Sequence, residues 1–212
     1  MPRPKQFLEL CGEPVLVHTL RAFDRCADVD EVILALAAEE RDAFAGCLSA
    51  FNLKKVSQVV EGGAERQDSV WQGLQRVDRA RTEIVAIHDG VRPLITPEHI
   101  SRVVAQARRS GAATLAIPVT DTIKEVEGAR VLKTLDRRRL YLVQTPQAFR
   151  TEILVSAYTR ARAEGRRATD DAALVEQCGL AVAVVEGSRD NLKITWPEDL
   201  ALAEFLLKRR QP

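Results

Sequence analysis

Three observations predict an α/β fold with a Rossmann-like, mostly parallel, doubly wound sheet. Short apolar runs recur along the chain, as in strands that are buried on both faces. Stretches with apolar residues at helical spacing separate these runs. No repeat, low-complexity tract or linker interrupts the alternation over 212 residues. Because alternating strands and helices build a parallel sheet under helical layers, residues 1–212 are expected to form one domain.

The expected strands are six short, largely apolar runs. They lie at residues 32–36, 56–60, 84–87, 114–119, 140–143 and 181–185. The clearest helix follows Thr96, a good N-cap before Pro97 at the first helical position. Pro197 marks the start of the last helix in the same way. Both helices therefore have a defined first turn.

The stretch "DTIKEVEGARVLKTLDR" breaks this rhythm and predicts a hairpin over about residues 119–138. Two short strands flank Gly128, which supplies the turn. A hairpin between strands of a parallel sheet has to leave that sheet, either as a surface excursion or as an arm that packs on another subunit. The second interpretation is favoured because an isolated two-stranded hairpin is marginally stable in water.

Composition argues against several classes of protein. The net charge of +1 and pI of about 7.7 do not indicate nucleic-acid or membrane-surface binding. Four widely spaced cysteines without a CxxC pair favour reduced thiols and a cytoplasmic location. The sequence contains no apolar run of transmembrane length and no signal peptide. The three histidines do not have the spacing of a metal site.

Polar residues follow the predicted strands, where ligands bind in open α/β sheets. "EGGAERQDSV" places Gly62, Gly63 and Ser69 at a turn before a helix, an arrangement that lets backbone N–H groups approach an anion. "HDGVRP" contributes Asp89 and Arg92, which are suited to a metal, hydroxyl or phosphate and equally to a structural ion pair. Six polar strand ends together suggest a polyanionic substrate. Arginine pairs at 138–139 and 166–167 are expected to be solvated.

These segments occur in a recognisable order. "PKQF", "EGGAERQDSV", "HDGVRP", "PVTDTIK", "LDRRRLYLVQTPQAF", "TDDAALVEQCG" and "VEGSRDNLKITWPEDLALAE" run from Pro4 to Glu204. In this order they resemble the 2-C-methyl-D-erythritol 4-phosphate cytidylyltransferases of nonmevalonate isoprenoid biosynthesis. The resemblance implies a nucleotidyltransferase fold and a homodimer formed through the hairpin arm. It also implies Mg²⁺ dependence and transfer of a cytidylyl group from CTP to a sugar-alcohol phosphate, with release of pyrophosphate.

The resemblance also implies roles for individual residues. Lys5 would stabilise the α-phosphate, while Arg137 and Lys193 would hold the attacking phosphate. Residues that would meet the nucleotide are Gly62, Gly63, Ala64 and Ser69. Residues that would contact the sugar-alcohol phosphate are Asp89, Arg92, Thr122, Thr145, Thr169 and Thr195. Thr122 and Arg137 would do so in the neighbouring subunit, and Asp190 would assist the metal. Some members carry Asp where this chain has Ala64, which leaves base selectivity in doubt if a side chain makes that contact.

The amino terminus departs from the pattern. In the family, a strand and a glycine-rich loop of the form AAGxGxRM precede "PKQF", and the Arg of that loop stabilises the transition state. Met1 stands where the loop methionine falls, so roughly 15–20 preceding residues are expected to be missing. A mis-assigned start codon is favoured over a truncation or a degenerate relative, because the other site residues are present. Arg3 does not occupy the position of the loop Arg.

Two other functions remain open from the sequence. A ribitol 5-phosphate cytidylyltransferase would share the fold and many of these segments. A catalytically inactive dimeric binding protein would follow if the loop were absent in the cell. The presence of Lys5, Asp89, Arg92, Arg137 and Lys193 argues against such decay.

Overall fold

The computed structural model describes residues 4–210, without the side chains of residues 42–43 and 45–49. Met1 and Arg3 therefore lie outside the described residues. The helices are α1 (Val15–Arg25), α2 (Ala38–Cys47), α3 (Arg66–Leu74), α4 (Pro97–Ser110), α5 (Thr151–Ala163), α6 (Asp171–Glu176) and α7 (Pro197–Arg210). The strands are β1 (Glu9–Leu10), β2 (Glu13–Pro14), β3 (Val32–Leu36), β4 (Val56–Glu61), β5 (Ile84–Ile87), β6 (Ala112–Pro118), β7 (Lys124–Glu127), β8 (Arg130–Thr134), β9 (Tyr141–Arg150) and β10 (Ala183–Glu186). Short 3₁₀ segments span Lys5–Phe7, Leu48–Phe51 and Arg137–Arg139.

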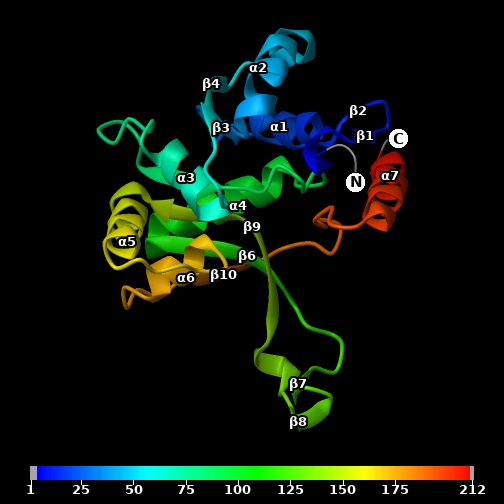
Figure 1. Cartoon of the computed structure of the whole chain (residues 1–212), viewed down its shortest axis with the longest axis vertical. Helices are drawn as coiled ribbons and strands as arrows, with labels where there is room; N and C mark the ends of the chain where they lie inside the picture. Colours follow the sequence, from blue (N-terminus) through cyan, green and yellow to red (C-terminus); the bar gives the residue numbers. More distant parts are fainter. Residues whose placement is uncertain (1–3, 211–212) are drawn as a thin grey trace.

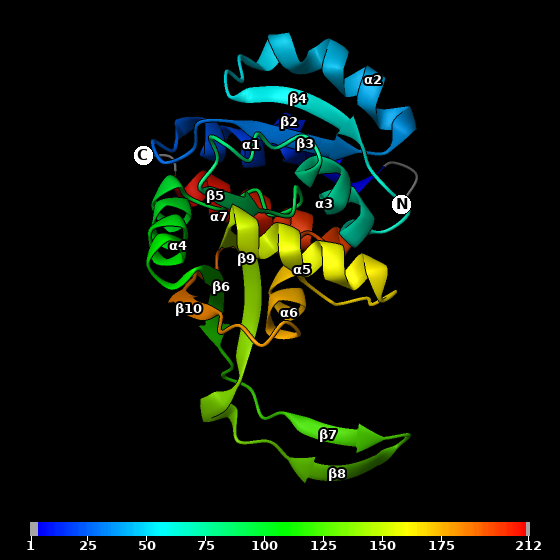
Figure 2. The same ribbon diagram turned by 90° about the vertical axis from the view of Figure 1, so that its left-hand side faces the viewer.

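The predicted α/β class is confirmed, and the larger sheet is mixed (Figure 1). Its strand order is β10-β6-β9-β5. Strand β10 runs parallel to β6, whereas β9 runs antiparallel to both β6 and β5. Strands β3 and β4 form a separate parallel pair. Helices pack against these sheets, with α4 against β6 and β9 and with α2 and α3 against β4 (Figure 2).

The predicted strands agree with the structure except around residue 144. The run at 84–87 coincides with β5, and the runs at 32–36 and 56–60 match β3 and β4. "QTPQAF" was expected to be a loop after the run at 140–143, but it continues as the buried half of β9. Two sheet neighbours bind this half, because Gln147 pairs with Ile87 on one side and with Thr114 on the other. Ladder partners on both sides keep the backbone extended from Gln147 to Phe149.

Helix starts follow their sequence signals. The Thr96 hydroxyl accepts a hydrogen bond from the His99 amide, and Pro97 occupies the first turn of α4. Helix α4 buries the predicted stripe of Ile100, Val103, Val104 and Ala107. Its core partners include Leu115 of β6 and Ala148 of β9. This packing fixes the sheet edge from which the strand-end residues project. Among residues 4–210, no helix has the length and apolarity needed to span a bilayer.

The predicted hairpin is present as β7 and β8, which extend away from the body (Figure 2). Gly128 occupies the turn with a φ of 57°, a conformation that favours glycine. All residues of both strands are exposed, including Val126 and Val131. The hairpin therefore gains little stability from its own subunit.

His88 joins the end of β5 to β9 through a chain of hydrogen bonds. Its Nε2 lies 3.3 Å from the Arg92 carbonyl oxygen, which can only accept, so Nε2 carries the proton. Nδ1 is then the acceptor for the Thr145 hydroxyl, 3.0 Å away, and the hydroxyl oxygen accepts from the Asp89 amide at 3.1 Å. This network requires a neutral imidazole. Burial lowers the pKa of His88 to about 4.

The His88 network predicts loss of stability in mild acid. Between pH 6.5 and about 4, the unfolded chain binds a proton at His88 that the folded chain does not. The free energy of unfolding therefore falls as the pH falls through this window, by up to about 3 kcal/mol. His88→Asn, which keeps an acceptor near the Nδ1 position, should lose less stability over the same range. Urea unfolding of both proteins at several pH values measures the difference, and parallel curves would contradict the prediction.

Candidate active site

A cluster of charged side chains lies where the segments after β4, β5 and β10 meet. At its centre is Asp89, which follows β5 and is only 11% exposed. Arg66 Nε lies 2.9 Å from Asp89 Oδ1, and Lys193 Nζ lies 3.0 Å from Oδ2. Arg92 Nε lies 3.7 Å from the same Oδ2. Three cations therefore surround one carboxylate.

A second carboxylate lies behind the first. Asp171 at the start of α6 is fully buried, and its Oδ2 accepts from Arg66 Nη2 at 2.7 Å. The hydroxyl of Tyr158 donates to the other oxygen at 2.5 Å. We call Arg66, Asp89, Arg92, Asp171 and Lys193 the Asp89 cluster. With three cations and two carboxylates, its formal net charge is +1.

The pKa values of groups in the cluster are determined mainly by burial and by the neighbouring charges. Burial alone would raise the pKa of Asp89, but Arg66 and Lys193 outweigh it and hold the pKa well below its usual range. Burial would lower the pKa of Arg66, whereas Asp171 and Asp89 raise it above the ordinary value. Burial and the adjacent Asp171 carboxylate raise the pKa of Tyr158. All these groups keep their charge state at neutral pH, so the cluster is a permanent positive site suited to an anion.

Between β4 and α3 lies a tight turn, Gly62–Glu65, which we call the glycine turn. The Gly63 amide donates to Ser69 Oγ at 3.1 Å, and the Ser69 hydroxyl donates to the Glu65 carbonyl at 3.2 Å. A Cβ atom on Gly63 would lie 2.3 Å from Asp68 Cβ, which excludes any side chain there. Ala64 is exposed at the tip of the turn. The predicted residues Gly62, Gly63, Ala64 and Ser69 are thus brought together.

The segment after β10 is tied to β9 by buried amides. Asn191 Nδ2 donates to the Thr145 carbonyl at 2.9 Å, and the Asn191 carbonyl accepts from Arg92 Nη1 at 2.8 Å. Gln144 Nε2 donates to the Ser188 carbonyl at 2.7 Å. These bonds place Lys193, which is 45% exposed, beside Asp89 with its ammonium open to solvent.

The other predicted threonines take different positions. Thr145 contacts the Asp89 amide and is close to the cluster, as expected. Thr169 is exposed two residues before Asp171. Thr195 is partly buried near Lys193, its amide donating to Asp199 Oδ2 at 2.7 Å. Asp199 thereby holds the start of α7. Lys5 lies in the 3₁₀ segment at the amino end, and its side chain makes no ion pair within residues 4–210.

Thr122 and Arg137 do not join the cluster of their own chain. Both belong to the arm that extends from β6 and β9 (Figure 1). Thr122 is exposed, and Arg137 Nη1 donates to the Thr120 carbonyl at 2.5 Å, at the base of the arm. Neither residue bonds a member of the Asp89 cluster of its own chain.

The described residues do not fit a protein-held Mg²⁺ site. Asp190 Oδ2 lies 3.2 Å from Arg210 Nη2, an ion pair that occupies the predicted ligand. Three cations neutralise Asp89, which makes it a poor metal ligand. Across residues 4–210, no group of three or more potential ligands gathers at one place.

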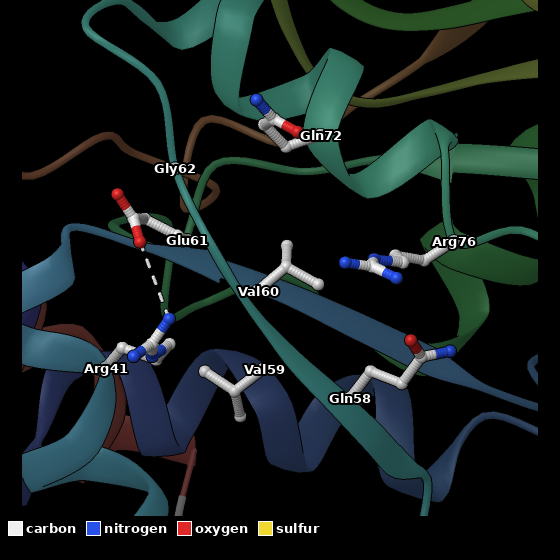
Figure 3. A pocket seen from close by; sticks show the side chains of 8 residues that line it. All are labelled: Arg41, Gln58, Val59, Val60, Glu61, Gly62, Gln72 and Arg76. Carbon is white, nitrogen blue, oxygen red and sulfur yellow. Dashed lines mark hydrogen bonds and ion pairs between the residues drawn. The ribbon is translucent and has the colours of Figure 1, made fainter.

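A cavity of about 560 Å³ opens beside the glycine turn (Figure 3). It runs along β4, with side chains from α2 and α3 on its walls. Its lining residues are Arg41, Gln58, Val59, Val60, Glu61, Gly62, Gln72 and Arg76. The cavity shares Gly62 with the turn but contains no member of the Asp89 cluster, so the charged site and the cavity are distinct.

Sequence reasoning missed Arg66, Asp171 and Tyr158. Arg66 lies within "EGGAERQDSV", in which only the turn residues and Ser69 were predicted to bind a ligand. Asp171 lies in "TDDAALVEQCG", from which only Thr169 was assigned a role, and its neighbour Asp170 caps α6. The arginines at 166–167 are exposed, as predicted, and Arg167 Nη1 also lies 3.0 Å from Asp68 Oδ2.

The sequence is similar over nearly its whole length to proteins of one family. The sequence profile described as 2-C-methyl-D-erythritol 4-phosphate cytidylyltransferase matches residues 1–209. Proteins of that name from Bacillus velezensis and Symbiobacterium thermophilum are 46% and 48% identical to the chain. Both alignments cover 96% of this chain, and they cover 88% and 85% of the relatives, respectively.

Solved structures extend the similarity to the fold. The crystal structure of the Thermus thermophilus cytidylyltransferase superposes with a TM-score of 0.82 at 40% identity, covering 97% of this chain and 94% of the other. The 4-diphosphocytidyl-2C-methyl-D-erythritol synthase of Anaerococcus prevotii superposes with a TM-score of 0.86 at 32% identity, covering 95% and 88%. Because the profile matches almost the whole chain and these relatives align with it over 95–97% of its length, one conclusion follows: the chain belongs to the 2-C-methyl-D-erythritol 4-phosphate cytidylyltransferase family.

Proposed function

We propose that the chain joins CTP to 2-C-methyl-D-erythritol 4-phosphate and releases pyrophosphate. The observation that carries this proposal is the cationic Asp89 cluster next to the glycine turn, in a chain of this family. The cluster suits a phosphate group, and the turn suits a nucleotide that approaches the backbone closely. The product is 4-diphosphocytidyl-2-C-methyl-D-erythritol.

The reaction is an in-line displacement at phosphorus. An oxygen of the alditol phosphate forms a bond to the α-phosphorus of CTP while the bond from that phosphorus to the β-phosphate oxygen breaks. Positioning and charge stabilisation supply most of the catalysis in such transfers. Lys193 and Arg92 orient the attacking phosphate, because Asp89 fixes both cations without cancelling the net positive charge. Lys5 serves the α-phosphate.

The active form in this proposal is a homodimer. Arg137 bonds the Thr120 carbonyl and not the Asp89 cluster of its own chain, and the hairpin β7–β8 extends away from the body of the molecule (Figure 2). Large apolar side chains at the arm and its base are exposed, namely Val126, Val131, Leu132, Tyr141, Leu142 and Val143. Leu142, for example, is 56% exposed. Contact with a second copy would bury these residues and bring Arg137 to the partner's alditol phosphate.

Magnesium enters this proposal on the nucleotide. Phosphate oxygens and water satisfy most of the coordination of Mg²⁺ at many nucleotide sites, so a protein cage is not required. Asp190, already paired with Arg210, is not assigned as a ligand. We place the enzyme in the cytoplasm, where the described cysteines Cys11, Cys26 and Cys178 would remain free thiols as they are here.

Substrate choice provides the direct test. With CTP and Mg²⁺, pyrophosphate release should be at least about tenfold more efficient with methylerythritol phosphate than with ribitol 5-phosphate, because a shaped site discriminates hydroxyl and methyl groups. A coupled pyrophosphate assay measures kcat/KM for both. Preference for ribitol phosphate would replace the proposed substrate. Calorimetric binding of CTP without turnover would instead indicate an inactive binding protein.

Complementation between two inactive variants tests the dimer. Arg137→Ala and Lys193→Ala should each lower kcat/KM for the alditol phosphate by at least about 100-fold, because each removes a cationic side chain that would stabilise the transition state. Co-expressed, they should regain about a quarter of the wild-type activity. Half of the randomly formed dimers would be mixed, and each would have one intact site. No recovery in a mixture that contains mixed dimers would show that both residues act within one chain.

Gly63→Ala tests the glycine turn. The new Cβ would collide with Asp68, so the turn must shift, and we expect the Kd for CTP to rise at least about tenfold. Gly73→Ala in α3 is the matched control, because nothing lies within 4 Å of a Cβ there. The control should leave CTP binding unchanged. Equal Kd values for the two variants, measured by calorimetry, would contradict the assignment.

A further inference from the structure

We propose that Arg66 is a positioning residue that aligns Lys193 for the attacking phosphate by holding Asp89 between them. This inference rests on the proposed function and deepens it. Arg66 follows the glycine turn as the first residue of α3, and neither composition nor strand-end position had indicated it. Its guanidinium lies between two carboxylates from distant parts of the chain.

The guanidinium of Arg66 bonds both carboxylates directly. Nε donates to Asp89 at 2.9 Å, and Nη2 donates to Asp171 at 2.7 Å. One planar group with fixed donor directions can hold two carboxylates at a set separation. An ammonium group has no such fork. The separation between Asp89 and Asp171 therefore depends on arginine at this position and not on charge alone.

Asp171 anchors Arg66 on the side away from the solvent. Its carboxylate is fully buried and is held by the Tyr158 hydroxyl at 2.5 Å. Its amide donates to Gln147 Oε1 at 3.1 Å, and Gln147 lies fully buried within β9. A buried carboxylate with these partners cannot move far without losing several hydrogen bonds. Arg66 thus connects a rigid anchor to the partly open side of the site.

The first turn of α3 is also attached to the segment before α6. Gln67 Nε2 donates to the Arg166 carbonyl at 3.1 Å, and the Ala168 amide donates to Gln67 Oε1 at 3.2 Å. The ion pair between Asp68 and Arg167 adds a third contact. These contacts fix the backbone from which Arg66 projects, so its side chain has a defined starting point.

On the open side, the chain of alternating charges ends at Lys193. Asp89 accepts Arg66 through Oδ1 and meets Lys193 through Oδ2 at 3.0 Å. A shift of Asp89 would therefore also displace the ammonium group of Lys193. Because misplacement by about 1 Å can cost on the order of 100-fold in rate, Arg66 influences catalysis without contacting either substrate.

Arg66→Lys tests this role. We expect kcat/KM for the alditol phosphate to fall at least about tenfold, while the Kd for CTP changes by less than about threefold and Tm stays near wild type. Arg108→Lys is the matched control, since Arg108 also lies between two carboxylates, Asp28 at 3.6 Å and Glu83 at 3.4 Å. It lies on α4 outside the cluster and should leave the kinetics unchanged.

A double-mutant cycle separates positioning from structural support. If Arg66 acts through Lys193, Arg66→Lys should cost less than about twofold in a Lys193→Ala background, because the group that it aligns is already absent. If the losses in kcat/KM of the two single variants multiply in the double variant, the inference is overturned. It is also overturned if Arg66→Lys lowers CTP affinity and Tm as strongly as it lowers kcat/KM. An active wild type with an unaffected Arg66→Lys variant would also overturn it.

A readout independent of turnover keeps the inference testable if the proposed function fails. Titration of the Asp89 carboxyl carbon by NMR follows its contact with Arg66 directly. Arg66→Gln removes the cation and should move the Asp89 titration midpoint upward, towards the ordinary range for aspartate. An unchanged midpoint would show that Arg66 does not hold Asp89, whatever the enzyme assay gives. A wild type that releases no pyrophosphate would count against the proposed function alone.

Discussion

The site depends on one constraint, which is that a nearly buried carboxylate must keep its charge. Asp89 is 11% exposed, and an isolated charge there would be costly. Arg66, Arg92 and Lys193 remove that cost, and each comes from a different part of the chain. Because these three side chains must all reach Asp89, α3, the segment after β5 and the segment after β10 have to lie close together. The same requirement leaves a net positive charge at the edge of the sheet, where a phosphate can bind.

Elements with strong local signals could be predicted from the sequence. Thr96 and Pro97 define the start of α4, and Gly128 defines the hairpin turn, because each acts through its immediate neighbours. The glycine turn and Asp89 were also found, since both follow apolar runs. The extent of β9 could not be found in this way. Residues 147–149 pair with β5 on one side and with β6 on the other, and those pairings link positions far apart in the sequence.

The same limit applies to Arg66, Asp171 and Tyr158. Nothing near Arg66 in the sequence distinguishes it from a solvated helix residue, and its partners are 23 and 105 positions away. Asp171 directly follows Asp170, which caps α6, and its own partners Arg66 and Tyr158 are distant in the sequence. The predicted contribution of Asp190 to a metal site had no support from distant residues, and its partner is Arg210. Family resemblance named residues that are expected to meet the substrates, whereas the structure adds the partners of those residues.

The arm has a consequence for the kinetics of assembly. Strands β7 and β8 pair with each other, and their side chains remain exposed on their own subunit. A subunit that has finished folding by itself would therefore still lack the surroundings that order this hairpin. With the proposed dimer, recovery of activity after dilution from denaturant would include a second-order step, whereas recovery of the core would be first-order. The interval between the two would lengthen as the protein becomes more dilute, and during that interval the exposed apolar arm would be the part of the molecule most prone to association with the wrong partner.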